Sequence, residues 1–148
     1  MSPAGLPLDG LAVLNGRTFL GAGLAGDIAW FQFGPSRASI SPAGQDRITG
    51  DYALHVSCSW EWESAPGVAI ASDGSSLEAI SKLGEGSPHL TSVVGVDSST
   101  LILLFASGAR LVLYLDPTSA SEQARLLRPG LLGPHLVLYG GSHEWHEV

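Results

Sequence analysis

The sequence has little charge, and the basic residues that it has are not grouped. Charged residues make up 14% of the 148 residues, against about 25% in a typical soluble domain. The formal net charge is −7. An acidic chain without a basic patch repels phosphate groups, which argues against binding to nucleic acid or to anionic membrane surfaces. The basic residues lie at Arg17, Arg37, Arg47, Lys82, Arg110, Arg125 and Arg128.

Cysteine and long hydrophobic runs are also scarce. Cys58 is the single cysteine, so no internal disulfide can form. The most apolar stretch, Leu101–Leu115, is interrupted by Arg110 and is shorter than the roughly 20 residues of a membrane-spanning helix. No basic residue precedes Arg17 and no unbroken apolar core follows the N-terminus, so no signal peptide is predicted. These absences predict a cytoplasmic protein that does not contact membranes.

Glycine and proline are frequent without reaching the level of a disordered chain. They number 19 and 9 among 148 residues, about a fifth of the chain, which is below the level typical of low-complexity sequence. The length suits one domain. We predict a single β-rich domain over residues 1–148, with residues 1–10 and 142–148 as flexible ends.

Alternation of apolar and polar residues is the main structural signal. It is clearest from Tyr52 to Trp62, where every second residue is apolar, and this predicts a half-buried strand. That strand exceeds the usual length, so a bend or bulge is expected near Ser57–Ser59. Leu101–Ala106 and Ala109–Leu115 predict a central β-hairpin that is covered on both faces.

The remaining elements are weaker. Short helices are predicted at Ser76–Leu83 and Ser119–Leu127, and the predicted loops are Gly34–Gly50, Gly84–Pro88 and Arg128–Pro134. Many short strands joined by glycine-rich turns favour a mostly-β fold, namely an antiparallel sandwich, roll or open barrel, with α+β as the alternative. The weaker strands are Thr18–Gly23, Ile28–Phe33, Val68–Ala71, Val93–Val96 and Leu136–Tyr139.

The segment Gly21–Gly26 matches the G-x-G-x-x-G pattern of dinucleotide-binding proteins. In those proteins a helix begins at the glycines and points its N-terminus at the pyrophosphate. Here Asp27–Phe33 follows, which has a strand-like composition and ends at Gly34-Pro35. We therefore interpret the glycines as a turn between two strands rather than as a nucleotide site.

His55 is the most suggestive single side chain. It lies on the polar side of the Tyr52–Trp62 strand, on the same side as Glu61. An acid such as Asp27, brought close by a neighbouring strand, would complete a general acid–base site, and Trp60 would belong to the same pocket. The alternative is a surface histidine with one hydrogen bond and, for Asp27, an aspartate that stabilises a turn.

Two further groups of residues are candidates for binding. Trp60, Trp62, Tyr52 and Trp30 are candidates for a ligand-binding or partner-binding surface, with burial in the core as the alternative. His143, His146 and Glu147 are candidates for a divalent transition-metal site, if a helical turn brings the histidines to one face. No other cofactor is indicated. Cys58 belongs to the apolar side of its strand, where a buried thiol is unreactive.

A resemblance to a family covers residues 16–75 only. The segment Gly50-Asp51-Tyr52-Ala53-Leu54-His55-Val56-Ser57-Cys58-Ser59-Trp60-Glu61 resembles the Gly-x-x-Ala-Leu-His-x-x-Cys-Pro-Trp-Arg stretch of a bacterial family of uncharacterised proteins. Gly26-Asp27-Ile28 and Phe31-Gln32-Phe33-Gly34 are similar to its Asp-Met…Phe-Gly stretch. This chain has Ser59 where proline is usual and Glu61 where arginine is usual, so a role for that arginine does not transfer. The resemblance implies a small, strand-rich bacterial cytoplasmic domain without a known activity.

Two functional hypotheses follow. The first is a non-enzymatic protein-interaction domain, of the accessory or immunity type, that binds another protein or forms a homodimer. Its support is the acidic charge and the lack of a catalytic motif. The second is a small-molecule-binding or hydrolytic pocket formed by His55, Asp27 and Trp60. The second hypothesis requires these side chains to converge on one concavity.

Overall fold

The computed structural model describes residues 8–40, 43–64, 68–71, 80, 83, 88–97, 99–129, 131, 133–140 and 142–146. Within these ranges the chain is mostly β, as the sequence predicted. The elements are α1 (Leu8–Leu11), the 3-10 turn η1 (Ala12–Leu14), β1 (Phe19–Ala25), β2 (Ile28–Ile40), β3 (Asp46–Val56), β4 (Ser59–Ser64), β5 (Val68–Ala71), β6 (Leu90–Asp97), β7 (Thr100–Phe105), β8 (Arg110–Tyr114), β9 (Ala124–Leu127), β10 (His135–Leu138) and β11 (His143–His146).

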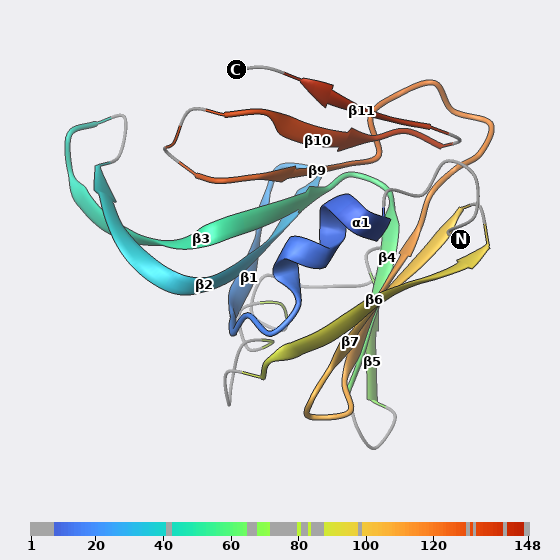
Figure 1. Cartoon of the computed structure of the whole chain (residues 1–148), viewed down its shortest axis with the longest axis horizontal. Coiled ribbons are helices and arrows are strands. Elements are labelled where there is room, and N and C mark those ends of the chain that lie inside the picture. The colour runs from blue at the N-terminus through green and yellow to red at the C-terminus, as the bar shows by residue number, and fades with distance from the viewer. Residues whose placement is uncertain are drawn as a thin grey trace.

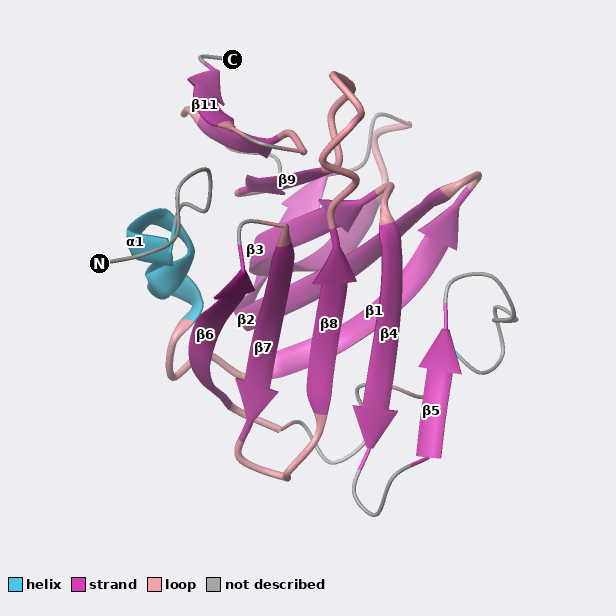
Figure 2. Cartoon of the chain, turned by 90° about the vertical axis from the view of Figure 1, so that its right-hand side faces the viewer, coloured by secondary structure: helices cyan, strands magenta, loops and turns pink. Residues whose placement is uncertain are grey.

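The strands form two sheets in which every described pairing is antiparallel. The first sheet has the order β1-β2-β3-β9-β10-β11, and the second sheet has the order β5-β4-β8-β7-β6 (Figure 1). Figure 2 shows the second sheet in front, with its strands running obliquely across β1, β2 and β3 behind it. Within the described residues the architecture is therefore an antiparallel sandwich that does not close into a barrel.

Aromatic side chains fill the space between the sheets. From the first sheet, Phe19 stacks on Trp62 of the second with ring centroids 5.1 Å apart, and Phe31 meets Trp60 edge-on at 5.3 Å. The ring centroids of Phe105 on β7 and Trp62 are 4.9 Å apart. Offset and edge-to-face pairs of this kind add to the stabilisation from burial. These contacts join the two sheets into one core.

The helical turn formed by α1 and η1 packs against the β10–β11 end of the first sheet. Leu11 and Leu14 of this turn are buried in the core. At Gly10 an added Cβ would lie 2.9 Å from Leu136 Cδ2 and 3.1 Å from Trp145 Cζ2, so the absence of a side chain allows the close approach. Residues 8–10 lie in α1, and Gly10 is the point at which this helix approaches the first sheet.

The long strand predicted from Tyr52 to Trp62 is two strands in different sheets. β3 ends at Val56 and β4 begins at Ser59, and the backbone N–H groups of Ser57 and Cys58 both donate to the Gln123 carbonyl, at 2.9 and 3.1 Å. The alternation continues across this corner because both strands turn the same set of residues toward the core.

Two other predictions were wrong. The predicted loop Gly34–Gly50 is mostly the paired ends of β2 and β3, with Arg37 opposite Thr49 and Ile40 opposite Asp46. Its small and polar side chains hid the strand pattern. The predicted helix Ser119–Leu127 contains strand β9 instead, because Leu126 pairs with Leu54 and Leu136 on either side. The predicted helix Ser76–Leu83 and loop Gly84–Pro88 lie largely outside the described residues.

The other strands form where the sequence predicted them. Gly26-Asp27 forms the turn between β1 and β2, and Gly26 has a φ of 63°, a conformation that glycine adopts at little cost. β7 and β8 form the predicted central hairpin, but residues of β7 alternate between buried and half-buried, so its outer face is only partly covered. No described helix has the length and hydrophobicity needed to cross a membrane.

Candidate functional site

His55 lies on the outer face of the first sheet. Its neighbours Leu54 and Val56 are in the core, and successive side chains of a strand point to opposite faces. His55 therefore points away from the core, in register with Trp30 on β2 and Arg125 on β9. This face carries polar groups from several strands.

Arg125 organises the polar groups around His55. It donates two hydrogen bonds to the Glu122 carboxylate, at 2.6 and 3.0 Å, and its Nη1 lies 3.1 Å from His135 Nδ1. Burial, with the charges of Arg125 and His135, lowers the pKa of His55, and burial and Arg125 also lower the pKa of His135. These shifts favour the neutral form of both imidazoles.

The structure brings Asp27 and Trp60 together but not His55. Asp27 and Trp60 line a hollow of about 250 Å³ at the corner between β3 and β4, next to Ser57–Ser59. His55 points to the outer face instead. Burial raises the pKa of the Cys58 thiol beside this hollow to about 11, so the thiol is protonated at neutral pH. Glu61 lies in the second sheet, opposite Val112.

The four predicted surface aromatics occupy three different environments. Trp60 and Trp62 are 3% exposed and belong to the core, so neither ring is available to a partner. Trp30 lies outside the core against Gly23, where an added Cβ would come within 2.2 Å of the ring. Tyr52 is half-buried, with the guanidinium groups of Arg17 and Arg128 over its ring. The alternation that placed all four on strands did not distinguish these environments.

The C-terminal histidines are on a strand, not on a helical turn. His143 pairs with Leu138 and His146 with His135 across β10 and β11. Because they are three positions apart on a strand, their side chains point to opposite faces. His146 Nε2 lies 2.9 Å from Glu144 Oε2. Among the described residues no group of three metal-binding side chains is present, and Glu147 lies outside them.

Three arginines converge on Asp51, a grouping that the sequence did not suggest. Arg128 Nη2 lies 2.6 Å from Asp51 Oδ1, Arg17 Nη1 3.2 Å from Oδ2, and Arg37 Nε 3.4 Å from Oδ1. The guanidinium groups of Arg17 and Arg128 lie 4.6 and 5.4 Å from the centre of the Tyr52 ring. A hydrogen bond from Arg128, with the charges of all three arginines, lowers the pKa of Asp51. We call this group the arginine cluster.

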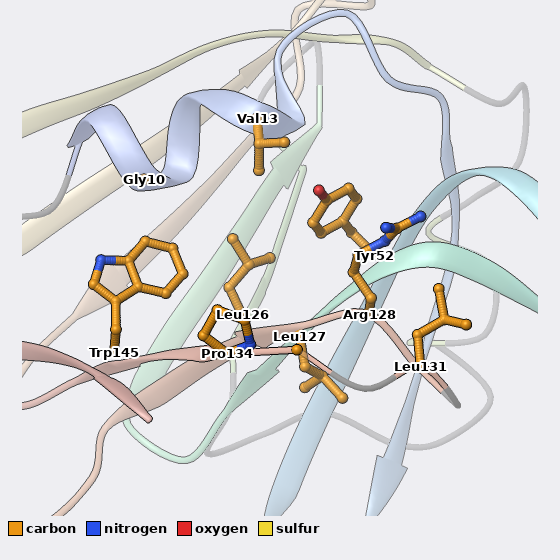
Figure 3. A pocket seen from close by; sticks show the side chains of 10 residues that line it. Gly10, Val13, Tyr52, Leu126, Leu127, Arg128, Leu131, Pro134 and Trp145 are labelled. Carbon is orange, nitrogen blue, oxygen red and sulfur yellow. The ribbon is translucent and has the colours of Figure 1, made fainter. Parts of the chain in front are cut away.

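A groove of about 290 Å³ begins beside the arginine cluster and runs beneath the α1–η1 turn. In Figure 3 the ring of Trp145 closes one end, while Tyr52 and Arg128 lie at the other. Most of its wall is apolar, so the groove has one cationic end and one aromatic end. The side chains and glycines that line it are Gly10, Val13, Tyr52, Leu126, Leu127, Arg128, Leu131, Gly133, Pro134 and Trp145.

The outer face of the second sheet carries aliphatic side chains. Val94, Ile102 and Val112 lie in register across β6, β7 and β8, on the side opposite the core. Val94 is 39% exposed and Val96, further along the edge strand β6, is 58% exposed, whereas Ile102 is half-buried and Val112 is only 4% exposed. No described helix or strand covers this face, toward which Figure 2 looks. We call it the aliphatic face, formed by Val94, Val96, Ile102, Leu104, Val112 and Tyr114.

Comparisons with protein-family models, curated proteins and solved structures find no match. That result is consistent with the resemblance to a family without a known activity.

Proposed function

We propose that this chain is a non-enzymatic protein-interaction domain that binds a protein partner through the aliphatic face. The observation that carries the proposal is the outer side of β6, β7 and β8, where Val94 and Val96 on the edge strand are 39% and 58% exposed and are continuous with the half-buried Ile102. A contiguous apolar patch on the surface of a small protein is typical of an interaction site. We place the protein in the cytoplasm, without contact to a membrane or to nucleic acid.

The distribution of the candidate catalytic groups favours binding over catalysis. His55 faces outward from the first sheet, Asp27 lies at a corner hollow, and Glu61 lies on the second sheet. A general acid–base pair needs its groups within hydrogen-bond reach of one reacting atom. The three groups do not share such a location.

The charges around the aliphatic face indicate the chemistry of its partner. Glu61 lies opposite Val112 in the adjacent strand, and Asp97 lies at the end of β6. Glu63 is paired with Arg110, whose Nη2 is 2.8 Å from the carboxylate. The face is therefore an apolar centre with an acidic rim, on a chain of net charge −7. We infer a partner with an apolar centre and basic residues around it.

The test compares two substitutions at matched edge positions. Val94 on β6 is 39% exposed and Leu24 on β1 is 37% exposed, so a lysine at either site should cost little stability. Tagged wild type, Val94→Lys and Leu24→Lys are used to capture partners from the source cells. We expect one stoichiometric partner with wild type and Leu24→Lys, and about a tenfold weaker complex with Val94→Lys.

Two further measurements complete the test. Binding of the captured partner should weaken with added salt if its basic residues meet the acidic rim. Light scattering after size exclusion determines whether a second copy of the chain is the partner, in which case Val94→Lys should restore the monomer. Equal capture by both variants, or no stoichiometric partner in repeated captures and a monomer in solution, would overturn the proposal.

A further inference from the structure

The arginine cluster has more positive charge and more hydrogen-bond donors than Asp51 balances. Three guanidinium groups surround this carboxylate, which is the one carboxylate within ion-pair distance of them in the described part of the chain. Each guanidinium has five N–H donors, whereas a carboxylate accepts about four hydrogen bonds. The cluster therefore has an excess of positive charge, although the whole chain is acidic.

The donors of the three arginines are used unequally. Arg17 donates to the carbonyls of Val13 and Gly34 as well as to Asp51. Arg37 donates to the Pro129 carbonyl, but its Nε is buried without a hydrogen bond within the described residues. Arg128 donates one described hydrogen bond, to Asp51, and its side chain is 48% exposed. Arg128 thus retains donors at the surface, where it lines the groove.

The groove joins this cationic end to an apolar interior. Val13 and Leu126 lie along its length and the Trp145 ring lies at the far end (Figure 3). Its volume of about 290 Å³ is near the lower limit of small-molecule sites, which is roughly 300 Å³. A ligand that fits it is of medium length, apolar along most of that length and anionic at one end.

We propose that the groove binds a medium-length amphiphilic carboxylate, with its carboxylate on Arg128 beside Tyr52 and its apolar chain directed toward Trp145. A carboxylate is favoured because the same guanidinium already binds one, that of Asp51, at 2.6 Å. Arginine pairs with carboxylates through directed, charge-assisted hydrogen bonds. This inference is independent of the partner-binding proposal, because the groove lies on the first sheet and the aliphatic face on the second.

Decanoate is the probe, titrated into the full chain by calorimetry, with decan-1-ol as its uncharged counterpart. We expect saturable binding of one decanoate per chain and clearly weaker binding of the alcohol. Arg128→Gln should weaken decanoate binding at least about tenfold, because a charge-assisted hydrogen bond is lost. The matched control is Arg110→Gln, since Arg110 is 43% exposed and also pairs with one acid, Glu63.

A second pair of variants leaves the arginine cluster intact. Val13→Glu places a negative charge in the groove, and Leu20→Glu is its control, because both residues are 37% exposed. Decanoate binding should be lost in the first variant and kept in the second, with unchanged circular dichroism spectra in both. The proposal is overturned if decanoate does not saturate, if decan-1-ol binds as tightly, or if each variant behaves like its control.

Discussion

The outer faces of the two sheets have opposite character. On the first sheet, His55, Arg125 and His135 form a polar group with Glu122. On the second sheet, the outer side carries the exposed Val94, the half-buried Ile102 and the buried Val112 in register across three strands. An antiparallel sheet with one face in water usually alternates apolar and polar residues along each strand. The first sheet follows that rule around His55, whereas the second sheet departs from it along β6, β7 and β8.

The inner and outer residues of a strand in this protein therefore meet different requirements. The inner alternation is needed by both sheets, because both contribute to one aromatic core. The outer residues are not needed for the core, so an aliphatic outer face calls for another explanation, and binding to a partner is the one that we propose. On this proposal, a substitution on the inner side of a strand lowers the free energy of unfolding, whereas a substitution on the outer side weakens binding to the partner.

The largest expected effect tests this directly with adjacent residues of β7. Leu103 is 1% exposed, whereas Ile102 next to it is only half-buried and points to the aliphatic face. Leu103→Ala should lower the free energy of unfolding by about 2–5 kcal/mol, through lost contacts and a cavity. Ile102→Thr should lower it by less than about 1 kcal/mol. Urea unfolding followed by tryptophan fluorescence measures both. Equal losses would mean that the aliphatic face is part of the core.

The next effect concerns the arginine cluster at the end of the first sheet. Asp51→Asn removes the negative charge that holds three guanidinium groups together, and Asp51 is only 15% exposed. We expect a loss of about 1–3 kcal/mol at neutral pH. Asp46→Asn is the control, because Asp46 is exposed on the same strand, and it should cost less.

The pH dependence of the Asp51→Asn effect has a definite sign. The pKa of Asp51 is below its ordinary value of 3.8 in the folded chain. Its contribution to stability is therefore complete above that value and is lost as the pH falls through the lower folded value. The difference between wild type and Asp51→Asn should shrink in acid. A difference that stays constant down to the acid transition would contradict the role given to the carboxylate.

The strands could be predicted where alternation within one segment is sufficient. The prediction failed where the structure depends on contacts between segments that are distant in the sequence. Alternation over Tyr52–Trp62 predicts apolar residues that face a core, but it is the same whether the chain stays in one sheet or turns into another at Ser57. The β2–β3 hairpin was missed because a strand of small polar residues resembles a loop until its partner is known. The spacing of His143 and His146 suggested a helical turn, but pairing with β10 places both residues on a strand.

The sites were less predictable than the fold. His55 was correctly assigned to the polar side of its strand, but the acid expected next to it, Asp27, lies at a different corner. Arg17, Arg37 and Arg128 are far apart in the sequence, and strand pairing and the η1 turn bring them to Asp51. A site assembled in this way leaves no periodic signal in a single sequence.

The smallest effect concerns the polar outer face of the first sheet. Burial and the neighbouring positive charge lower the pKa of His55 from its ordinary value of 6.5. Below that value the unfolded chain therefore binds more protons than the folded chain, and stability falls as the pH decreases. Removal of the imidazole removes this contribution, so His55→Gln should lose less stability than wild type between about pH 7.5 and about pH 5.5.

The measurement is the free energy of unfolding by urea at several pH values in that range. His143→Gln is the control, because His143 is an exposed residue on the side of β11 opposite His146, and its profile should follow that of wild type. An unchanged slope in His55→Gln would show that the pH sensitivity does not arise from His55. A reduced slope would mean that the titration of His55, on the outer face of the first sheet, contributes to the stability of the fold. The role proposed for the aliphatic face is binding to a partner.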